Sequence, residues 1–401
     1  MNEKNKLRIL MLLQNCAYPR DDRVRREAKT LVEDGYQITI IAPSASGQPW
    51  TETINGVHVI RFPEPPSANG FLGYVWEYGY SMVAISILSF YVFIRYNFDV
   101  IHAHQPPDTF AIIAAFYKLF GKKYVFDHHD LAPELYYARF TGHGNSVVYK
   151  LLLLFEKWSC RLANHVIATN QSYKQIELER GNVQNVKITI VRNGPDLKEL
   201  PQSLIDQELR RKAKIIIGYV GVMGIQDGVD NLIRALRYLI DKCGKTDFLC
   251  VLVGDGAAMP GLRKLVEELK LSDYVFFAGW VAGQQDIARY LNSMDICVAP
   301  EPSDPYNDRS TAAKIMEYMA FGKPIAAFNL PEHRYTAQSA AIYASVNNIP
   351  DLAEKISYLI DNPDLRAKFG EMGKARLMNE LSWVQQEKAL IEAYKAISSE
   401  K

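Results

Sequence analysis

Residues 299–327, APEPSDPYNDRSTAAKIMEYMAFGKPIAA, contain the structural unit from which this chain is built. The preceding DICVAP (295–300) has the pattern of a short buried strand, a polar, proline-broken loop follows it, and STAAKIMEYMA has helical periodicity. Gly322 marks the end of that helix, and GKPIAAF (322–328) predicts the next strand. Strand, loop and helix in alternation are typical of open α/β sheets, in which the loops after the strands bind ligands.

The predicted helix has two different faces. At about 100° per residue, one face carries an apolar stripe and the other carries polar side chains; the stripe is Ala312, Ile315, Met316, Met319 and Ala320. Ser310 and Thr311 stand where an N-cap is expected, and Lys314 adds a charge to the positive helix end, so this face predicts an anion site. Glu317, one turn deeper, suits a hydroxyl-rich neighbour such as a ribose. A solvated Lys–Glu pair is the alternative.

The same alternation runs through nearly the whole chain and restarts after a turn-rich stretch, VRNGPDLKELPQ (191–202). A chain of 401 residues is too long for one ordinary core. We therefore predict an α/β fold with two Rossmann-like domains that face each other across a cleft, at 1–198 and 199–382. The last helix, about 383–401, is expected to cross back to the first domain.

Composition limits the classes of partner. Lys plus Arg number 46 and Asp plus Glu number 45, so no overall positive field favours nucleic acid. Five scattered cysteines predict reduced thiols, and the start of the chain passes from charged residues directly into a strand-like run, so we expect a cytoplasmic protein without a signal peptide.

One apolar segment, residues 79–96, has two interpretations. Its uninterrupted apolar run is short of the ~20 residues that a spanning helix needs, so it is either a buried or half-buried core helix or a contact with the membrane interface. The aromatic flank at 70–80 and the basic helix at 21–31, which carries Arg23, favour the second interpretation. Interleaved acidic residues in that helix favour an ordinary solvated face instead.

Histidines and glycines mark further candidate sites. Seven of the eight histidines precede residue 166, and four lie in HAH (102–104) and DHHD (127–130), each at the end of a predicted strand. Structural histidines, a metal site and a polar pocket that contacts a substrate hydroxyl are the three interpretations. Glycine-rich turns follow two strands of the second half, at 218–228 and 253–256, where backbone could approach a ligand or simply turn.

Taken together, these motifs resemble the family 4 retaining glycosyltransferases of the GT-B fold, bacterial enzymes that transfer a sugar from a nucleotide-sugar. The resemblance covers essentially the whole chain. It is carried by DDRVRREAKTLVEDGYQITIIAP, DVIHAHQPPD, DHHDLAPELY, IATNQS, VRNGPD, GDG, VFFAGWV and, most specifically, STAAKIMEYMAFGKP.

The resemblance implies roles for matching residues. Glu317 would hold the donor ribose, Lys314 would lie near the diphosphate, and His129 would lie near the transferred sugar and the reaction centre. The further residues implied for the donor are Gly221, Val222, Gly254, Gly279, Trp280, Val281, Asp308, Arg309, Ser310 and Thr311. An acceptor pocket is expected at Arg23, His104, Asp127 and Asp130.

The chain departs from the family pattern at three positions. The family commonly has two glutamates eight positions apart, and here Arg309 takes the place of the first. The arginine and lysine that often clamp the diphosphate are replaced by Val222 and Asp227. Asp308 or backbone amides would then read the sugar, and Lys314 with the helix end would supply most of the positive charge. These departures resemble a subgroup associated with surface-polysaccharide synthesis.

The resemblance also implies a mechanism and partners. Retaining members are thought to react by front-face attack, with the departing diphosphate helping to deprotonate the acceptor. We expect a UDP-sugar donor, with an N-acetylhexosamine as the sugar, a saccharide or polyprenyl-linked acceptor, no cofactor, and no metal, because no Asp-x-Asp motif is present. Peripheral contact with the inner face of the membrane is a further expectation. A nucleotide-sugar epimerase and a non-catalytic binding subunit are the alternatives.

Overall fold

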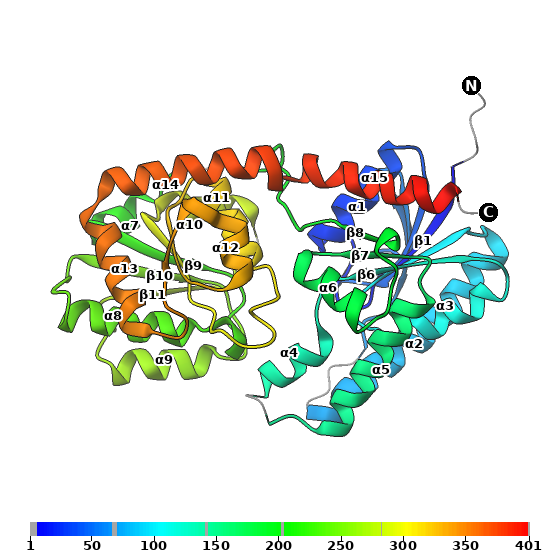
Figure 1. Ribbon diagram of the computed structural model, residues 1–401, viewed down its shortest axis with the longest axis horizontal. Coiled ribbons are helices and arrows are strands. Elements are labelled where there is room, and N and C mark those ends of the chain that lie inside the picture. Colours follow the sequence, from blue (N-terminus) through cyan, green and yellow to red (C-terminus); the bar gives the residue numbers. More distant parts are fainter. Residues whose placement is uncertain (1–5, 66–69, 141–142, 202–203, 282, 400–401) are drawn as a thin grey trace. The chain divides into compact units, whose positions relative to one another are not determined.

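The computed structural model describes residues 6–65, 70–140, 143–201, 204–281 and 283–399. The chain forms two compact units (Figure 1). Unit 1 comprises residues 1–136, 144–193 and 386–401, and unit 2 comprises residues 137–143 and 194–385. Each unit is built around its own sheet.

The sheet of unit 1 has eight strands in the order β3-β4-β2-β1-β5-β6-β7-β8. Only β3 runs antiparallel to its neighbour; all other pairs are parallel. Their bounds are β1 (Arg8–Leu12), β2 (Gln37–Pro43), β3 (Thr51–Ile54), β4 (Val57–Phe62), β5 (Val100–His104), β6 (Lys123–His128), β7 (His165–Ala168) and β8 (Ile188–Ile190). The sequence patterns did not predict β3 and β8, which are short and half exposed, because they bury too little apolar surface to show a clear pattern.

Helices cover both faces of this sheet, with α1 on one face and α2, α3 and α5 on the other (Figure 1). Their bounds are α1 (Asp22–Glu33), α2 (Gly70–Arg95), α3 (Phe110–Lys118), α4 (Ala132–Arg139), α5 (Ser146–Leu162) and α6 (Gln171–Glu179). Helix α1 begins as its sequence predicts, because the carboxylate of Asp21 accepts hydrogen bonds from the backbone N–H groups of Arg23 and Val24.

The sheet of unit 2 has six strands, all parallel, in the order β11-β10-β9-β12-β13-β14. The strands are β9 (Ile215–Val220), β10 (Phe248–Val253), β11 (Val275–Gly279), β12 (Ile296–Ala299), β13 (Ile325–Phe328) and β14 (Ala341–Ala344). The helices are α7 (Gln207–Lys212), α8 (Val229–Asp241), α9 (Met259–Glu268), α10 (Gln284–Ser293), α11 (Ala313–Ala320), α12 (Pro331–Ala337), α13 (Ile349–Asp361) and α14 (Pro363–Arg376).

Alternate residues of the central strand β9 enter two separate cores. Ile215, Ile217 and Tyr219 pack with α8, α9 and α13, whereas Ile216 and Val220 pack with α7, α10 and α11. A strand that is buried on both faces is expected to be continuously apolar, as β9 is. The prediction of two parallel-sheet α/β domains is therefore confirmed.

The last helix, α15 (Trp383–Ser399), contributes its residues from 386 onward to unit 1. Two contacts fix it there. The phenol of Tyr394 lies 2.8 Å from Nδ1 of His102, and the ammonium of Lys123 donates to the carbonyl of Ile397 at 2.5 Å. Tyr394 is fully buried, so this helix forms part of the core of unit 1.

Candidate active site

The strand order of unit 2 identifies where its ligand is expected. From the central strand β9 the chain first adds β10 and β11 on one side and then β12, β13 and β14 on the other. The loops that follow β9 and β12 therefore diverge at the carboxyl end of the sheet, which is where open α/β sheets bind ligands. Gly221 follows β9, and the loop that leads to Lys314 follows β12.

The two glycine turns pack against each other, backbone to backbone. Gly221 has φ 149°, and its N–H donates to the carbonyl of Val253 at 3.0 Å. A Cβ on Gly254, which has φ 132°, would lie 1.9 Å from the carbonyl oxygen of Gly221. A Cβ on Gly221 would lie 3.1 Å from Cε of Lys314. Glycine is therefore required at both turns, because a side chain would separate them from each other and from the lysine.

A buried asparagine fixes the loop between β12 and α11. Nδ2 of Asn307 donates to the carbonyls of Gln226 and Pro302 at 2.9 and 3.0 Å, and Nδ2 of Asn231 donates to the carbonyl of Pro300 at 3.1 Å. These bonds hold the loop against the turn that follows β9. As a result, Glu301 and Asp227, which the sequence separates widely, both reach the same ammonium group.

Lys314 is the centre of this site. Its ammonium forms ion pairs with Glu301 and with Asp227 (Nζ to Oδ1, 3.2 Å), donates to the phenol of Tyr219 at 2.9 Å, and lies 4.6 Å from the centre of that ring. The side chain is only 10% exposed. Burial acts to lower the pKa of Lys314, but Glu301, Tyr219 and Asp227 together raise it well above its ordinary value. Lys314 therefore stays charged.

Two carboxylates, those of Glu301 and Asp227, contact the single ammonium of Lys314. Burial acts to raise the pKa of Glu301, but attraction to Lys314 and then to His333 leaves this pKa below its ordinary value. Burial raises the pKa of Asp227, and Lys314 opposes that rise only in part. The positive charge that the sequence analysis assigned to a bound diphosphate is thus already shared with two protein carboxylates, and no sequence pattern pointed to Glu301 as a partner.

The N-cap prediction at Ser310 and Thr311 is wrong. Helix α11 begins at Ala313, and its N-cap, Ala312, makes no side-chain capping bond. The N–H of Ser310 instead closes a turn onto the carbonyl of Tyr306 at 3.0 Å, and Oγ1 of Thr311 donates to Oε2 of Glu332 at 3.2 Å. The turn arises because a loop rich in Asp and Asn bonds to its own backbone, which delays the helix.

The remaining residues predicted for the donor site lie after the ends of β9, β11 and β12. Glu317 is exposed on α11, one turn beyond the nearly buried Lys314. Val222 and Trp280 are 57% and 71% exposed, and Trp280 directly follows Gly279, which has φ 74°. The other predicted residues lie in the same loops: Val281 packs partly against the core, Asp308 accepts from Oγ of Ser303 at 3.1 Å, and Arg309 donates to the carbonyl of Pro305 at 2.7 Å.

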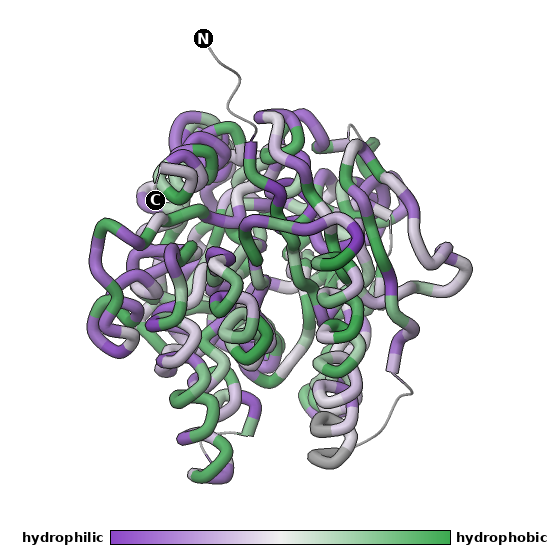
Figure 2. The backbone as a smooth tube through the Cα atoms, turned by 90° about the vertical axis from the view of Figure 1, so that its right-hand side faces the viewer, coloured by the Kyte–Doolittle hydropathy of each residue, from purple (hydrophilic) through white to green (hydrophobic). Residues whose placement is uncertain are grey.

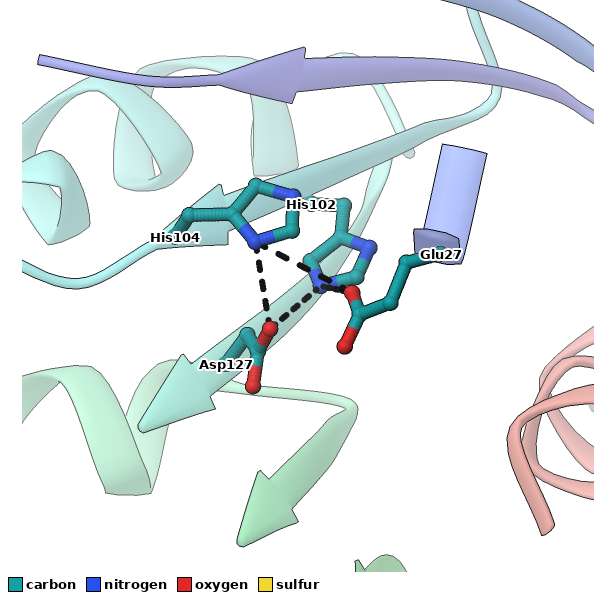
Figure 3. Close-up of side chains that lie close together, drawn as sticks. All are labelled: Glu27, His102, His104 and Asp127. Carbon is teal, nitrogen blue, oxygen red and sulfur yellow. Dashed lines mark hydrogen bonds and ion pairs between the residues drawn. The ribbon is translucent and has the colours of Figure 1, made fainter. Parts of the chain in front are cut away.

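Unit 1 holds the predicted acceptor residues at the carboxyl ends of β5 and β6. His104 ends β5 and pairs in register with Asp127 on β6. Arg23 and Glu27 reach them from α1, one helical turn apart, and His102 lies two residues before His104 on the same strand. Figure 3 shows Glu27, His102, His104 and Asp127 converging from these three elements.

Arg23 binds the carboxylate of Asp127 through two nitrogens. Its Nη2 lies 2.6 Å from Oδ1 and its Nε lies 3.0 Å from Oδ2. Oδ2 is also 3.1 Å from Nδ1 of His104 and 2.6 Å from Nε2 of His129. The side chain of His129 is 13% exposed, whereas the other three are almost fully buried. The cluster therefore holds His129 at its outer edge, and Asp130, the next residue, bonds through its N–H to Oε1 of Gln105 at 2.8 Å.

Burial and the arginine decide the charges of this cluster. Burial raises the pKa of Asp127, but Arg23 and then His129 lower it well below its ordinary value. Burial raises the pKa of Glu27 far above its ordinary value, against the attraction of Arg23. Burial also lowers the pKa values of His102 and His104. At neutral pH, Arg23 and Asp127 are therefore charged and both histidines are neutral, while burial favours the protonated form of Glu27.

Glu27, His102, His104 and Asp127 could each offer one atom to a metal ion, and these atoms lie within 4.8 Å of one another. The position of Arg23 argues against a divalent cation at this site. Its Nε is 3.0 Å from Oδ2 of Asp127, the oxygen that faces the histidines, and 3.1 Å from Oε1 of Glu27, so a fixed positive charge already contacts both carboxylates that the ion would need. The donor set does not suit a metal for that reason.

The two histidines of DHHD have different environments. His128 is buried, with Nδ1 3.2 Å from Oε1 of Glu177, and burial lowers its pKa to about 3. It is a structural histidine. His129 instead faces the Arg23–Asp127 pair. The residue pattern left these roles open, because adjacent residues at a strand end can point to opposite sides, and only the family resemblance singled out His129.

Comparisons with known proteins agree with both units. Residues 23–199 match the family model "Glycosyltransferase Family 4", and residues 202–376 match "Glycosyl transferases group 1". A 2-deoxystreptamine glucosyltransferase from Streptomyces kanamyceticus is 23% identical over 281 residues, 67% of this chain and 70% of that protein. The capsular polysaccharide biosynthesis glycosyltransferase CapM from Staphylococcus aureus is 22% identical over 58% of this chain and 62% of its own length. Among solved structures, Anabaena Alr3699/HepE in complex with UDP and glucose has a TM-score of 0.73 at 17% identity, over 97% of this chain and 100% of that one.

Proposed function

This chain belongs to the glycosyltransferases, with a family 4 domain followed by a group 1 domain on the GT-B fold, and we propose that it transfers a sugar from a UDP-sugar with retention of configuration. The proposed sugar is an N-acetylhexosamine. The proposed acceptor is a saccharide or a polyprenyl-linked saccharide in the synthesis of a surface polysaccharide, at the cytoplasmic face of the membrane. CapM, a similar protein, carries a name from capsular polysaccharide synthesis.

The observation that carries the donor proposal is the packing of Gly254 against Gly221, and of Gly221 against Lys314, at the switch point of the unit 2 sheet. Backbone without side chains and a permanently charged ammonium suit a diphosphate. Glu317 would bind the ribose hydroxyls from the exposed face of α11, and the exposed ring of Trp280 would border the base. A similar protein, Anabaena Alr3699/HepE, was solved with UDP bound, which favours UDP as the nucleotide.

Lys314 would stabilise the departing diphosphate, because charge develops on that group when the bond to the sugar breaks. For this, the ammonium of Lys314 would have to weaken its ion pair with Asp227 and form one with the phosphate. The raised pKa of Asp227 makes this carboxylate the easier of the two to neutralise, whereas Glu301 stays ionised and keeps Lys314 in position.

His129 would contact the transferred sugar or the acceptor hydroxyl, with Arg23 and Asp127 positioning its ring. In front-face transfer the diphosphate oxygen accepts the acceptor proton, so no protein nucleophile is needed. Transfer is proposed to need no divalent ion. Activity that persists in EDTA would support this, and activity that is lost in EDTA and restored by Mg²⁺ or Mn²⁺ would contradict it.

The first experiment is a thermal-shift panel with UDP, GDP, ADP and dTDP on the wild type, on Glu317→Ala and on Glu267→Ala, a matched exposed glutamate of α9. We expect UDP alone to raise the melting temperature of the wild type and of Glu267→Ala, and not that of Glu317→Ala. Stabilisation by another diphosphate would replace UDP in the proposal. No stabilisation by any of them would favour a non-catalytic binding subunit.

A further inference from the structure

Three neighbouring helices of unit 1 expose apolar side chains in regular stripes. On α2 the stripe is formed by Trp76, Val83, Ile87, Phe90 and Ile94, which are between 51% and 70% exposed. Their spacing of three, four or seven residues places them on one helical face, over a length of about 27 Å. The opposite face of α2 buries Ile85, Leu88 and Val92, so this helix carries large apolar side chains on both faces, which is unusual for a helix that faces water.

The stripe continues onto α3 and α5. Ile112 and Phe116 are 48% and 45% exposed on α3, and Leu119, which directly follows this helix, is 82% exposed. Helix α3 lies beside α2, because the ring of Phe93 is 5.3 Å from that of Phe120, just after α3, and the phenol of Tyr117 donates to Oγ of Ser89 at 3.0 Å.

On its other side α3 contacts α5, where the ammonium of Lys118 donates to the carbonyl of Leu162 at 2.6 Å. Helix α5 exposes Val147, Leu151 and Leu154 by 63%, 49% and 59%. Figure 2 views the molecule from the right-hand side of Figure 1 and shows helical stretches coloured green, the hydrophobic end of the scale. The three stripes together form one surface, which we call the α2–α3–α5 face.

The charges on the α2–α3–α5 face are almost all positive. Lys150 and Arg161 are exposed on α5, at about −60° and −40° from Val147 on the helical wheel, so they flank the apolar stripe. Arg95 is exposed at the end of α2. The three helices contain two acidic residues: Glu77 is half-buried near the start of α2, and Glu156 is buried and paired with Arg180. The whole chain has 46 basic and 45 acidic residues, so the excess of positive charge on this face is local.

We propose that the α2–α3–α5 face docks on an anionic lipid membrane, with the apolar stripes in the interfacial layer and the cations at the headgroups. This goes beyond the proposed transfer reaction and does not depend on it. An apolar surface flanked by Lys and Arg is what such a membrane binds. A second copy of the chain suits the face less well, because pairing it with itself would bring Lys150 and Arg161 near like charges.

The face lies on the membrane and does not cross it. The stretch Trp76–Arg95 is long and apolar enough to span by length and composition, and 28% of it is buried within unit 1. Ile85, Val92 and Ser89 are fully buried on its inner side, so withdrawal of α2 into a bilayer would expose the core of the unit. The basic helix α1 does not belong to this face, because it covers the other face of the unit 1 sheet and its Arg23 is buried against Asp127.

The test is co-sedimentation of the full chain with phosphatidylcholine vesicles, with and without phosphatidylglycerol. We expect binding to the anionic vesicles that weakens between about 0.05 and about 0.5 M salt. Ile87→Glu with Leu154→Glu should lower partitioning by about tenfold or more. The matched control is Val186→Glu, an apolar residue of the same unit that is 80% exposed but lies outside the face; it should bind as the wild type does.

Lys150→Glu with Arg161→Glu should weaken binding to anionic vesicles by about tenfold and leave the melting temperature unchanged. Lys264→Glu, an exposed lysine of unit 2, is the control for charge. Equal binding by the control and face variants would overturn the proposal. The proposal would also be overturned if the wild type bound neither kind of vesicle and sedimented as a dimer that Ile87→Glu dissociates. The face would then be an interface between two copies of the chain.

Discussion

Replacing Lys314 with methionine should make the stability of unit 2 fall more steeply as pH rises. The substitution keeps an unbranched side chain but removes the ammonium that contacts Glu301 and Asp227. In the wild type, the pKa of Glu301 is below its ordinary value of 4.5. Its contribution to stability is therefore present above pH 4.5 and is lost as pH falls through the folded-state pKa.

Without Lys314, burial is the largest remaining influence on both carboxylates, and burial raises their pKa values. Each would then favour folding when protonated and oppose it when ionised. We expect the stability of Lys314→Met to fall as pH rises above about 4.5. Removing one partner of a buried pair costs about 3–5 kcal/mol. At about 2–4 °C per kcal/mol for a domain of this size, the melting temperature at neutral pH should drop by roughly 6–20 °C.

The assay is denaturant unfolding from pH 4 to 8 of the wild type, Lys314→Met and the double variant with Glu301→Gln, followed by a probe of unit 2. The double variant should recover part of the loss, because one unpaired carboxylate is gone. Lys264→Met is the control, since its ion pair with Glu268 is 77% and 56% exposed and should contribute below about 1 kcal/mol. A loss as small as that of the control, or an unchanged pH slope, would refute the reasoning.

Three further outcomes are expected. Arg23→Met should lower the free energy of unfolding by about 3–5 kcal/mol, because it leaves Asp127 buried without its partner. Arg23→Lys should recover only part of this loss, since an ammonium cannot bind the carboxylate through two nitrogens. Full recovery in chemical denaturation would contradict this. Gly254→Ala should lower the free energy of unfolding by at least about 2 kcal/mol, because of the φ of this residue and the close carbonyl of the neighbouring turn. The control, Gly261→Ala, lies in open space on α9 and should stabilise by about 0.5–1 kcal/mol. Equal thermal shifts would argue against the packing of the turns. Burial raises the pKa of Glu156 from 4.5 to about 7 despite Arg180. The unfolded chain therefore loses this proton first as pH rises, and stability should fall between those pH values. Glu156→Gln should flatten this part of the plot of stability against pH, and an unaltered plot would contradict the prediction.

Long apolar strands and helices with clear periodicity could be predicted from the sequence. All six strands of unit 2 and the span of α15 correspond to predicted segments, because each buries enough apolar surface to show its pattern. The short strands β3 and β8 could not be predicted, since their residues are half exposed and their pairing comes from neighbours distant in the sequence.

By itself, the sequence determined the two α/β domains, the glycosyltransferase resemblance and the loops in which candidate residues lie, because hydrophobic periodicity and motif spacing are local properties. The tertiary structure decided which of those residues meet. Lys314 lies between Glu301 and Asp227, and Arg23 contacts the two carboxylates of the candidate metal cluster, Asp127 and Glu27, because strand order and loop packing set these distances. The same packing turned the outer faces of α2, α3 and α5 into one apolar surface that no single stretch of sequence contains.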